Sequence, residues 1–182
     1  YADAYGRALE GPEFFVILDG LTGRILAMEN WIERGDVSSW GTNPYAKVDR
    51  HLMAVAYLDG HLPSLIIARG TYTKIYVEAW NWRNGTLSKV WRYFKPSGGG
   101  GFHNVRIGDV DDDGKDEVIY GSIAIDDDGT ELWETGEGHG DYMHMSDIDP
   151  KRPGKEIWYV QEYGKNYGFN LRDARTGELI WG

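Results

Sequence analysis

The sequence predicts an all-β protein built from many short antiparallel strands. Short apolar and aromatic runs alternate with turn residues along the 182 residues, which include 25 Gly, 8 Trp and 12 Tyr. Pairs of such runs also recur, joined by glycine-containing turns such as Asn84-Gly85 and Asp128-Gly129. No long amphipathic helical pattern interrupts them, and a chain of this length can form one domain with a sizeable core.

Two kinds of hairpin alternate along the chain. An inner hairpin of mostly apolar residues occurs three times, and an outer hairpin with a glycine turn follows each one and also opens the chain. A Trp after three of the outer turns (Trp91, Trp133 and Trp181) is expected to pack between neighbouring sheets as a large apolar anchor. Strands are expected near residues 14–18, 24–29, 52–58, 64–69, 75–82, 88–93, 104–109, 116–121, 122–126, 130–134, 143–147, 155–161, 168–172 and 178–181.

One inner and one outer hairpin together make a four-stranded unit of about 40 to 50 residues, which is the size of a propeller blade. We therefore predict a β-propeller with about three and a half four-stranded blades. Propellers usually need about four to eight blades to close, so the chain is either part of a larger propeller or completes a ring with a second chain. The predicted units are 1–34 (the outer half of a blade), 51–95, 102–136 and 140–182 (successive blades), with connecting loops at 34–50 and 94–101.

The segment that follows the inner strand at 104–109 predicts a calcium site. Its carboxylates alternate in a D-x-D-x-D-G pattern, Gly114 allows the backbone to reverse, and strand-like runs flank it where an EF-hand would have helices. Calcium prefers six to eight oxygen ligands, which carboxylates and backbone carbonyls supply here. The alternative is a polar hairpin turn without metal. The predicted ligands are Asp109, Asp111, Asp113, Lys115 through its carbonyl, and Glu117.

A second and weaker calcium candidate follows the next inner strand. Asp147 and Asp149 alternate as in the first loop, and Glu156 closes the far side. Residues 150–154 lengthen this loop, so carbonyl oxygens must replace the missing third Asp. A charged hairpin tip without metal is the alternative interpretation.

A third metal candidate depends on the repeat. His103 lies six residues before Asp109, and Asp141 lies six residues before Asp147, so the two should occupy equivalent places at adjacent inner strands. His139 is close to Asp141 in sequence, and Glu162 ends the neighbouring strand. Nitrogen ligands by themselves favour a transition metal over calcium. A histidine near a β-turn is otherwise usually a hydrogen-bonding residue.

Composition excludes two classes of partner. The formal charge is −10 and no basic tract is present, so we expect no nucleic-acid partner. No apolar run approaches the roughly 20 residues of a membrane span, so we expect no membrane partner. The absence of cysteine leaves the redox compartment open, because metal ions can stabilise loops without disulfides.

A set of motifs is spread along most of the chain: Ala56-Tyr57-Leu58-Asp59-Gly60, Ala68-Arg69-Gly70-Thr71-Tyr72-Thr73, His103-Asn104, residues 109–117, Ile125-Asp126-Asp127-Asp128-Gly129, residues 136–141, His144, residues 147–154 and Arg172-Asp173-Ala174-Arg175-Thr176-Gly177. Together they resemble the rhamnogalacturonan lyases of polysaccharide lyase family 11, densely over residues ~48–182 and weakly before. Where the family carries a longer polar segment this chain has a glycine run, and Gly70-Thr71-Tyr72 has one aromatic where members usually have two.

This resemblance implies an eight-bladed propeller with several Ca²⁺ ions, calcium at the histidine site included, that cleaves the pectin backbone by β-elimination. It also implies an acidic plant cell-wall polysaccharide as substrate and a secreted protein. Elimination requires neutralisation of the uronate carboxylate and a base for the C5 proton. The base is not identified; weak catalytic candidates are Arg69, Tyr72, Lys74 and His144. An inter-blade salt bridge is the alternative role for Arg69.

Three functions remain open at this stage. The first is a calcium-dependent rhamnogalacturonan lyase or part of one, and the second is a non-catalytic carbohydrate-binding propeller that retains the calcium loops. The third is a structural half-propeller that assembles with the remaining blades or with a second chain.

Overall fold

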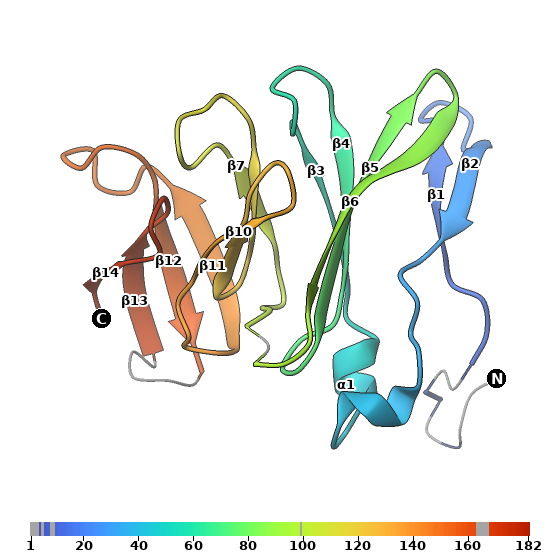
Figure 1. The fold of residues 1–182 in the computed structure, drawn as a ribbon, viewed down its shortest axis with the longest axis horizontal. Helices are drawn as coiled ribbons and strands as arrows, with labels where there is room; N and C mark the ends of the chain where they lie inside the picture. The colour runs from blue at the N-terminus through green and yellow to red at the C-terminus, as the bar shows by residue number, and fades with distance from the viewer. Residues whose placement is uncertain (1–3, 5, 8–9, 99, 163–167) are drawn as a thin grey trace.

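The computed structural model describes residues 4, 6–7, 10–98, 100–162 and 168–182, and within them the fold is all-β with only two short helices (Figure 1). The strands form four antiparallel sheets: one of two strands and three of four strands. The predicted all-β class is confirmed. None of the helices among the described residues is long and apolar enough to cross a membrane.

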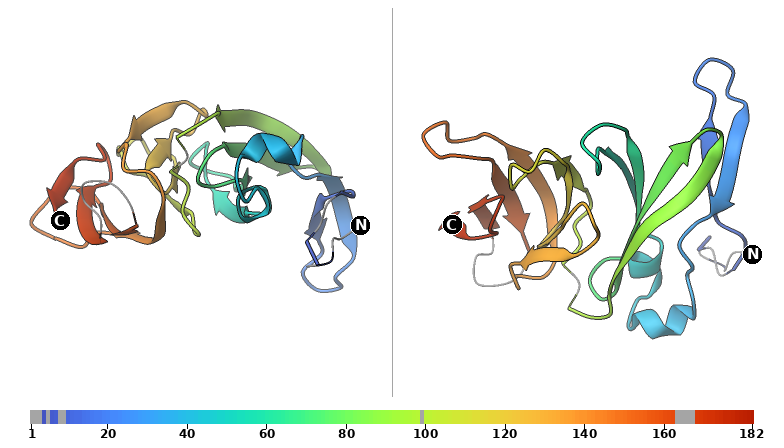
Figure 2. Two further views of the ribbon diagram at one scale, coloured as in Figure 1. Left: turned by 90° about the horizontal axis from the view of Figure 1, so that it is seen from below. Right: turned by 45° about the horizontal axis from the view of Figure 1, so that its top comes forward.

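The sheets follow the chain order, because each strand pairs with the next one along the sequence. Viewed from below, they succeed one another in an arc from the N-terminal to the C-terminal end (Figure 2). The strands of the first two sheets are β1 (Phe14–Leu18) and β2 (Ile25–Asn30), then β3 (His51–Ala56), β4 (Ser64–Arg69), β5 (Ile75–Arg83) and β6 (Thr86–Lys95). Those of the last two are β7 (Arg106–Gly108), β8 (Glu117–Tyr120), β9 (Ile123–Ile125) and β10 (Glu131–Glu134), then β11 (Gly140–Ser146), β12 (Glu156–Gln161), β13 (Gly168–Asp173) and β14 (Leu179–Trp181).

The core lies between neighbouring sheets, where apolar side chains of one sheet meet those of the next. Ile66 and Val77 of the second sheet pack with Val118 and Ile123 of the third in one buried cluster. A second cluster joins the third sheet to the fourth, and a third cluster joins the first sheet to the second. Burial of these apolar surfaces holds adjacent sheets together.

The anchoring role predicted for the tryptophans holds for two of the three. Trp91 packs against the cluster between the second and third sheets and donates its indole N–H to the Asp127 carbonyl at 2.7 Å. Trp133 is 9% exposed and donates to the Ala174 carbonyl at 3.1 Å. Trp181 departs from the prediction: it is 46% exposed and contacts Trp158 of its own sheet at 5.0 Å between ring centroids.

The connection predicted as a loop at 34–50 contains two four-residue helices instead, the 3₁₀ helix Val37–Trp40 and α1 (Tyr45–Val48). The Asp36 side chain caps the first by accepting the Ser38 N–H at 2.9 Å. Trp40 is 1% exposed and donates its indole N–H to the Arg34 carbonyl at 3.0 Å. This burial of an aromatic ring fixes a segment that turn signals alone describe as irregular.

Several strand boundaries also differ from the prediction, and β7 and β6 illustrate the causes. β7 is shorter than the expected 104–109, because Asn104 exchanges hydrogen bonds with the Met143 backbone of the next sheet at 2.8 and 3.1 Å. β6 is longer than the expected 88–93, since β5 and β6 stay paired as far as Arg83 and Thr86, next to the turn. The turn residues Asn84 and Gly85 both have positive φ, as a tight hairpin turn requires.

Candidate functional site

The two metal candidates near β7 lie at opposite ends of that strand. His103 precedes β7, whereas Asp109 follows it and opens the loop at residues 109–116, which we call the β7–β8 loop. In Figure 1 this loop lies at the top of the third sheet, and the chain enters β7 from below. The structure therefore separates the predicted ligands into two sites that share one strand.

At the lower end, His103, His139 and Asp141 converge, and each offers one ligand atom within 4.8 Å of the others. Glu162 joins them, with its Oε2 3.5 Å from His139 Nε2. We call these four residues the His cluster. Its members come from the segment before β7, the start of β11 and the end of β12. The structure thus brings together the set that the repeat predicted.

Hydrogen bonds fix the tautomer and orientation of His139. Its Nδ1 lies 2.6 Å from the Gly101 carbonyl, which can only accept, so Nδ1 carries the proton. The Thr71 hydroxyl, also bound to that carbonyl at 2.6 Å, lies 3.1 Å from the same nitrogen. His139 Nε2 is left with its lone pair, buried and without a hydrogen-bond partner among the described residues. An imidazole that donates one N–H to a carbonyl and keeps the other nitrogen free is typical of a metal ligand.

His103 completes the pair of imidazoles. Its Nε2 lies 3.7 Å from Asp141 Oδ1, and its ring centroid lies 4.9 Å from that of His139. Burial lowers the pKa of both histidines below the usual value of 6.5, so both are neutral at neutral pH. Tyr72 covers the site from the side, with its ring centroid 4.0 Å from that of His139.

The donor set of the His cluster fits a cation. A neutral imidazole lone pair that faces the carboxylates of Asp141 and Glu162 is repelled by them unless a positive charge lies between. Two imidazole nitrogens favour a transition metal, whereas the two carboxylates are also suitable for calcium. The arrangement of the protein atoms is compatible with a transition metal and with calcium.

At the upper end of β7, Asp109, Asp111 and Glu117 converge within 4.8 Å. Glu117 is fully buried, and its Oε2 accepts the Val110 N–H at 2.6 Å. Its Oε1 is buried without a hydrogen-bond partner among the described residues. Burial, together with the nearby charges of Asp111 and Asp109, raises the pKa of Glu117 to about 7. A buried carboxylate oxygen with no donor, beside two other carboxylates, fits a hard cation such as calcium.

The backbone of the β7–β8 loop is folded around these carboxylates. Asp109 accepts the N–H groups of Asp112 and Gly114 at 2.7 and 3.1 Å. Asp112 and Gly114 both have positive φ, which lets the chain reverse over a short distance. The spacing in the sequence therefore produces a cage of oxygens rather than an open hairpin tip.

A second group at this end of the strand contains a residue that was not among the predicted metal ligands. Asp127, from the β9–β10 turn, converges with Asp113 and Glu117 within 4.8 Å. The ammonium of Lys115, whose carbonyl was the predicted ligand, lies 3.1 Å from Asp127 and 3.2 Å from Asp113. Asp127 belongs to an outer hairpin, and only the position of the tandem Asp residues at 126–128 could have suggested it.

The weaker calcium candidate is arranged differently. Within the described residues, Asp147, Asp149 and Glu156 do not converge on a common point as the other groups do. Glu156 is buried and its Oε2 accepts the N–H groups of Ile148 and Asp149 at 2.9 and 3.0 Å. Arg152 lies 3.8 Å from its other oxygen. An arginine thus supplies positive charge to the carboxylate that the spacing suggested for calcium.

Of the four catalytic candidates, only Tyr72 lies beside the His cluster. Arg69 is fully buried and binds the Glu13 carboxylate and the Val48 carbonyl, so it forms the salt bridge that was the alternative role. Lys74 donates to the Ser39 hydroxyl at 2.7 Å. His144 is an exposed residue of β11 that stacks on Tyr142.

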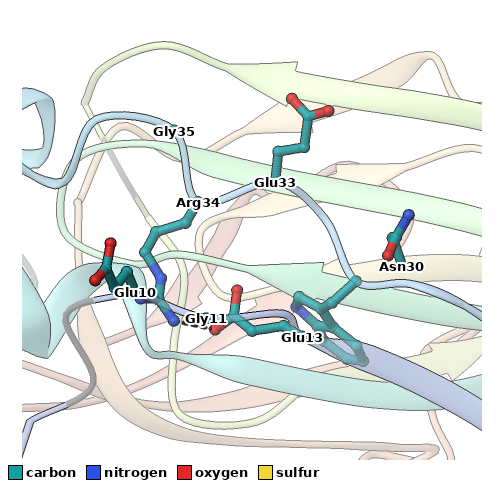
Figure 3. A pocket seen from close by; sticks show the side chains of 8 residues that line it. Glu10, Gly11, Glu13, Asn30, Glu33, Arg34 and Gly35 are labelled. Carbon is teal, nitrogen blue, oxygen red and sulfur yellow. Dashed lines mark hydrogen bonds and ion pairs between the residues drawn. The ribbon is translucent and has the colours of Figure 1, made fainter. Parts of the chain in front are cut away.

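A pocket beside the first sheet contains the partner of Arg69 (Figure 3). Glu13 lies there, bound to Arg34 at 2.5 Å, and the two arginines together neutralise it. Asp49 and His51 also approach Glu13. Because its central carboxylate is already paired with two guanidinium groups, this pocket is a salt-bridged seam between the first two sheets. Its lining residues are Glu10, Gly11, Glu13, Asn30, Trp31, Glu33, Arg34 and Gly35.

Comparisons with known proteins match this chain over its whole length. The sequence model of rhamnogalacturonan lyase family 11, C-terminal domain, matches residues 1–182. Rhamnogalacturonan endolyase YesW of Bacillus subtilis is 47% identical over 191 residues, covering 100% of this chain and 31% of the relative. Rhamnogalacturonan exolyase YesX of the same organism is 45% identical, with 100% and 31% covered.

Solved structures agree with these sequence matches. The crystal structure of rhamnogalacturonan lyase YesW superimposes with a TM-score of 0.93 at 47% identity, covering 100% of this chain and 33% of that one. A rhamnogalacturonan lyase of family PL11 from Bacillus licheniformis gives a TM-score of 0.93 at 46% identity, with 100% and 32% covered. The chain spans about a third of the length of the relatives it matches.

Proposed function

Because this chain belongs to the C-terminal domain of rhamnogalacturonan lyase family 11, we propose that it forms part of an enzyme that cleaves the rhamnogalacturonan backbone. The relatives that support this proposal are named as an endolyase and an exolyase. Calcium dependence, cleavage by β-elimination and secretion belong to the same proposal. The substrate would be an acidic pectin polysaccharide of the plant cell wall.

We extend the proposal to the architecture. The four sheets would be successive blades of a β-propeller, with residues 1–34 as the outer half of one blade and 51–95, 102–136 and 140–182 as the next three. The order of the strands and the arc of sheets in Figure 2 support this arrangement. The remaining blades of an eight-bladed ring would come from further sequence of the whole protein or from a second chain.

The single observation that carries the functional proposal is the geometry of the His cluster. His103, His139, Asp141 and Glu162 would hold a cation, and a bound cation would neutralise a uronate carboxylate and so make its C5 proton more acidic. The Gly101 carbonyl keeps the proton on His139 Nδ1 and directs Nε2 into the site. Tyr72 limits access of water from the side of its ring.

The other cation site has a different proposed role. Asp109, Asp111 and Glu117, joined by Asp113, would bind calcium as a structural ion at the upper end of β7. For Asp147, Asp149 and Glu156 the proposal of a calcium site is weaker, because Arg152 already approaches Glu156.

Ultraviolet absorbance of the unsaturated uronate product tests the activity. We expect the full chain with calcium to produce this absorbance from rhamnogalacturonan, and His139→Ala to lose most of it together with one bound ion. His61→Ala is the matched control, because His61 is exposed and lies outside the cluster. Activity that survives in His139→Ala after the ion is lost would contradict the role of the cluster.

A non-catalytic carbohydrate-binding or structural propeller is the second candidate. One observation favours it: three of the four catalytic candidates are engaged in contacts away from the His cluster. This alternative predicts oligosaccharide binding without any unsaturated product, or a ring assembled with a partner and no oligosaccharide binding. A mass measurement in solution identifies such an assembly.

A further inference from the structure

An open pocket adjoins the His cluster and is not accounted for by it. The pocket has a volume of about 470 Å³, which is in the range of small-molecule sites. Tyr72 belongs to both places, since it lines the pocket and its ring lies 4.0 Å from that of His139. The six lining residues are Thr42, Asn43, Ala46, Lys47, Tyr72 and Thr73.

The chemistry of this lining suits an acidic sugar. Thr42, Thr73 and Asn43 provide hydroxyl and amide groups that can exchange hydrogen bonds with sugar hydroxyls. Tyr72 adds an aromatic ring, and Lys47 adds a positive charge. A small number of polar groups and one charge, placed around an aromatic side chain, are typical of sites that fix the orientation of a small polar ligand.

Lys47 is a cation without a counter-charge among the residues that the structure describes. No hydrogen bond or ion pair of its ammonium occurs within the described part of the chain, whereas neighbouring Lys74 is bound to Ser39. Gly41 lies beside it, and a Cβ at that position would be 3.4 Å from Lys47 Nζ. In a chain with a formal charge of −10, a partly buried lysine with no acidic partner in the described ranges is available for an anion.

The backbone of the lining is held in an uncommon conformation. Asn43 and Tyr72 have φ angles of 50° and 60°, and a bulky residue such as tyrosine rarely adopts this left-handed region. The neighbour Thr71 is fully buried and bound to the Gly101 carbonyl, which holds the segment in place. Retained strain of this kind is concentrated at functional sites. Here it positions the Tyr72 ring between the pocket and His139.

From these observations we propose that the pocket binds a second uronate unit of the polysaccharide, near the uronate at the His cluster but separated from it along the backbone by a neutral rhamnose, with its carboxylate paired to the Lys47 ammonium. The assignment rests on the proposed function, because it requires an acidic polysaccharide at the cluster. It adds a second point of carboxylate recognition, formed by α1 and the β4–β5 turn, which would favour polysaccharides whose acidic units recur at close spacing.

Binding calorimetry on the calcium-loaded full chain tests this assignment with two probes, a rhamnogalacturonan oligosaccharide and its methyl-esterified form. We expect Lys47→Gln to weaken binding of the acidic probe about five- to tenfold, because a charge-assisted contact is lost. Binding of the ester should change little. Lys47→Arg should retain most of the affinity, and Lys151→Gln, at an exposed lysine of another loop, should leave it unchanged.

The outcomes separate this assignment from the proposed function. If the wild type binds the acidic probe and Lys47→Gln binds it equally well, the pocket is not a uronate site although the function stands. If Lys47→Gln weakens both probes equally, the lysine acts through the shape of the pocket and the carboxylate contact is overturned. If the wild type binds neither probe while its calcium content is complete, the proposed function fails as well.

Discussion

The β7–β8 loop and the His cluster occupy opposite ends of one strand and differ in how the sequence builds them. The loop gathers Asp109, Asp111 and Glu117 within one continuous segment, whereas the cluster takes its residues from three separate places in the chain. Burial shifts the pKa of Glu117 upward and those of His103 and His139 downward. In each case burial disfavours the charged form of the side chain.

The two regions also differ in what surrounds them. The β7–β8 loop contacts both neighbouring sheets: Asp116 accepts the Tyr57 N–H at 2.7 Å, and Lys155 and Arg175 donate to the carbonyls of Asp109 and Asp111 at 2.5 and 2.7 Å. The His cluster is instead bordered by an open pocket. An ion bound in the loop would therefore hold sheets together, whereas an ion bound in the cluster would lie where it could meet a ligand.

Removal of calcium should have the largest effect, and it should act through the loop. We expect a chelator to lower the melting temperature by about 5–10 °C, because an ion that binds only the folded state stabilises it by mass action. Differential scanning calorimetry with and without chelator measures this shift. The same melting temperature in both conditions would mean that neither site binds an ion that matters for folding.

Substitution of single carboxylates sharpens this comparison. Asp111→Ala should cost about 1–3 kcal/mol of unfolding free energy in calcium, because a charged ligand is lost and the remaining carboxylates repel one another. Asp126→Ala is the matched control in the neighbouring outer hairpin, outside the three-residue groups. Equal losses for the two variants, measured by denaturant titration in calcium, would remove Asp111 from the ligand set.

The sequence predicted most of the fold because its signals are local. Period-two patterns and glycine turns placed the strands, and the repeat grouped them in the order that the sheets have. It also predicted the convergence of His103, His139 and Asp141, since equivalent positions of a repeat become neighbours in space. These predictions need only the pattern of the chain itself.

The features that the sequence did not predict depend on contacts between segments far apart in the chain. Asp127 meets Glu117 only because the outer hairpin folds back over the loop, and Arg69 became a buried partner of Glu13 through the packing of two sheets. Lys47 lies on a short helix inside a segment that was predicted as a loop. No spacing rule in the sequence predicts these positions, because each depends on how segments far apart in the chain pack together.

The effect of Glu117→Gln on stability should change sign when calcium is added. Without metal, the raised pKa of about 7 means that the folded state binds a proton that the unfolded state releases, so stability falls as the pH rises from the unfolded pKa through about 7. Above that pH the uncharged Gln should gain roughly 1–3 kcal/mol relative to Glu. In calcium, the variant should instead be less stable, because a buried ligand has lost its charge.

Melting curves of both proteins, with calcium and with chelator, test this reversal. A variant that is less stable than the wild type under both conditions would show that Glu117 contributes through packing and its hydrogen bond to Val110, not through a cation.

The smallest expected effect is a difference between the two sites in how metal affinity depends on pH. Protons compete with metal at Glu117 below about pH 7, so calcium affinity of the loop should decline there first. The histidines have pKa values lowered below 6.5 by burial, so they stay neutral and free to bind metal until the pH falls below that value. Burial of the neutral histidines contributes stability that is fully present above the ordinary histidine pKa. That stability is lost as the pH falls through the lowered pKa of the folded state.

Metal titrations of Glu117→Gln and of His139→Ala isolate the two sites, because each variant retains the other site. We expect the cluster, measured in Glu117→Gln, to keep constant affinity from about pH 8 down to the usual histidine value and to weaken only below it. The loop, measured in His139→Ala, should weaken already near pH 7. If the metal affinity of the cluster already falls near pH 7, its imidazoles titrate as exposed histidines do. The buried lone pair of His139 would then not be the ligand, and the contrast between the two ends of β7 would be lost.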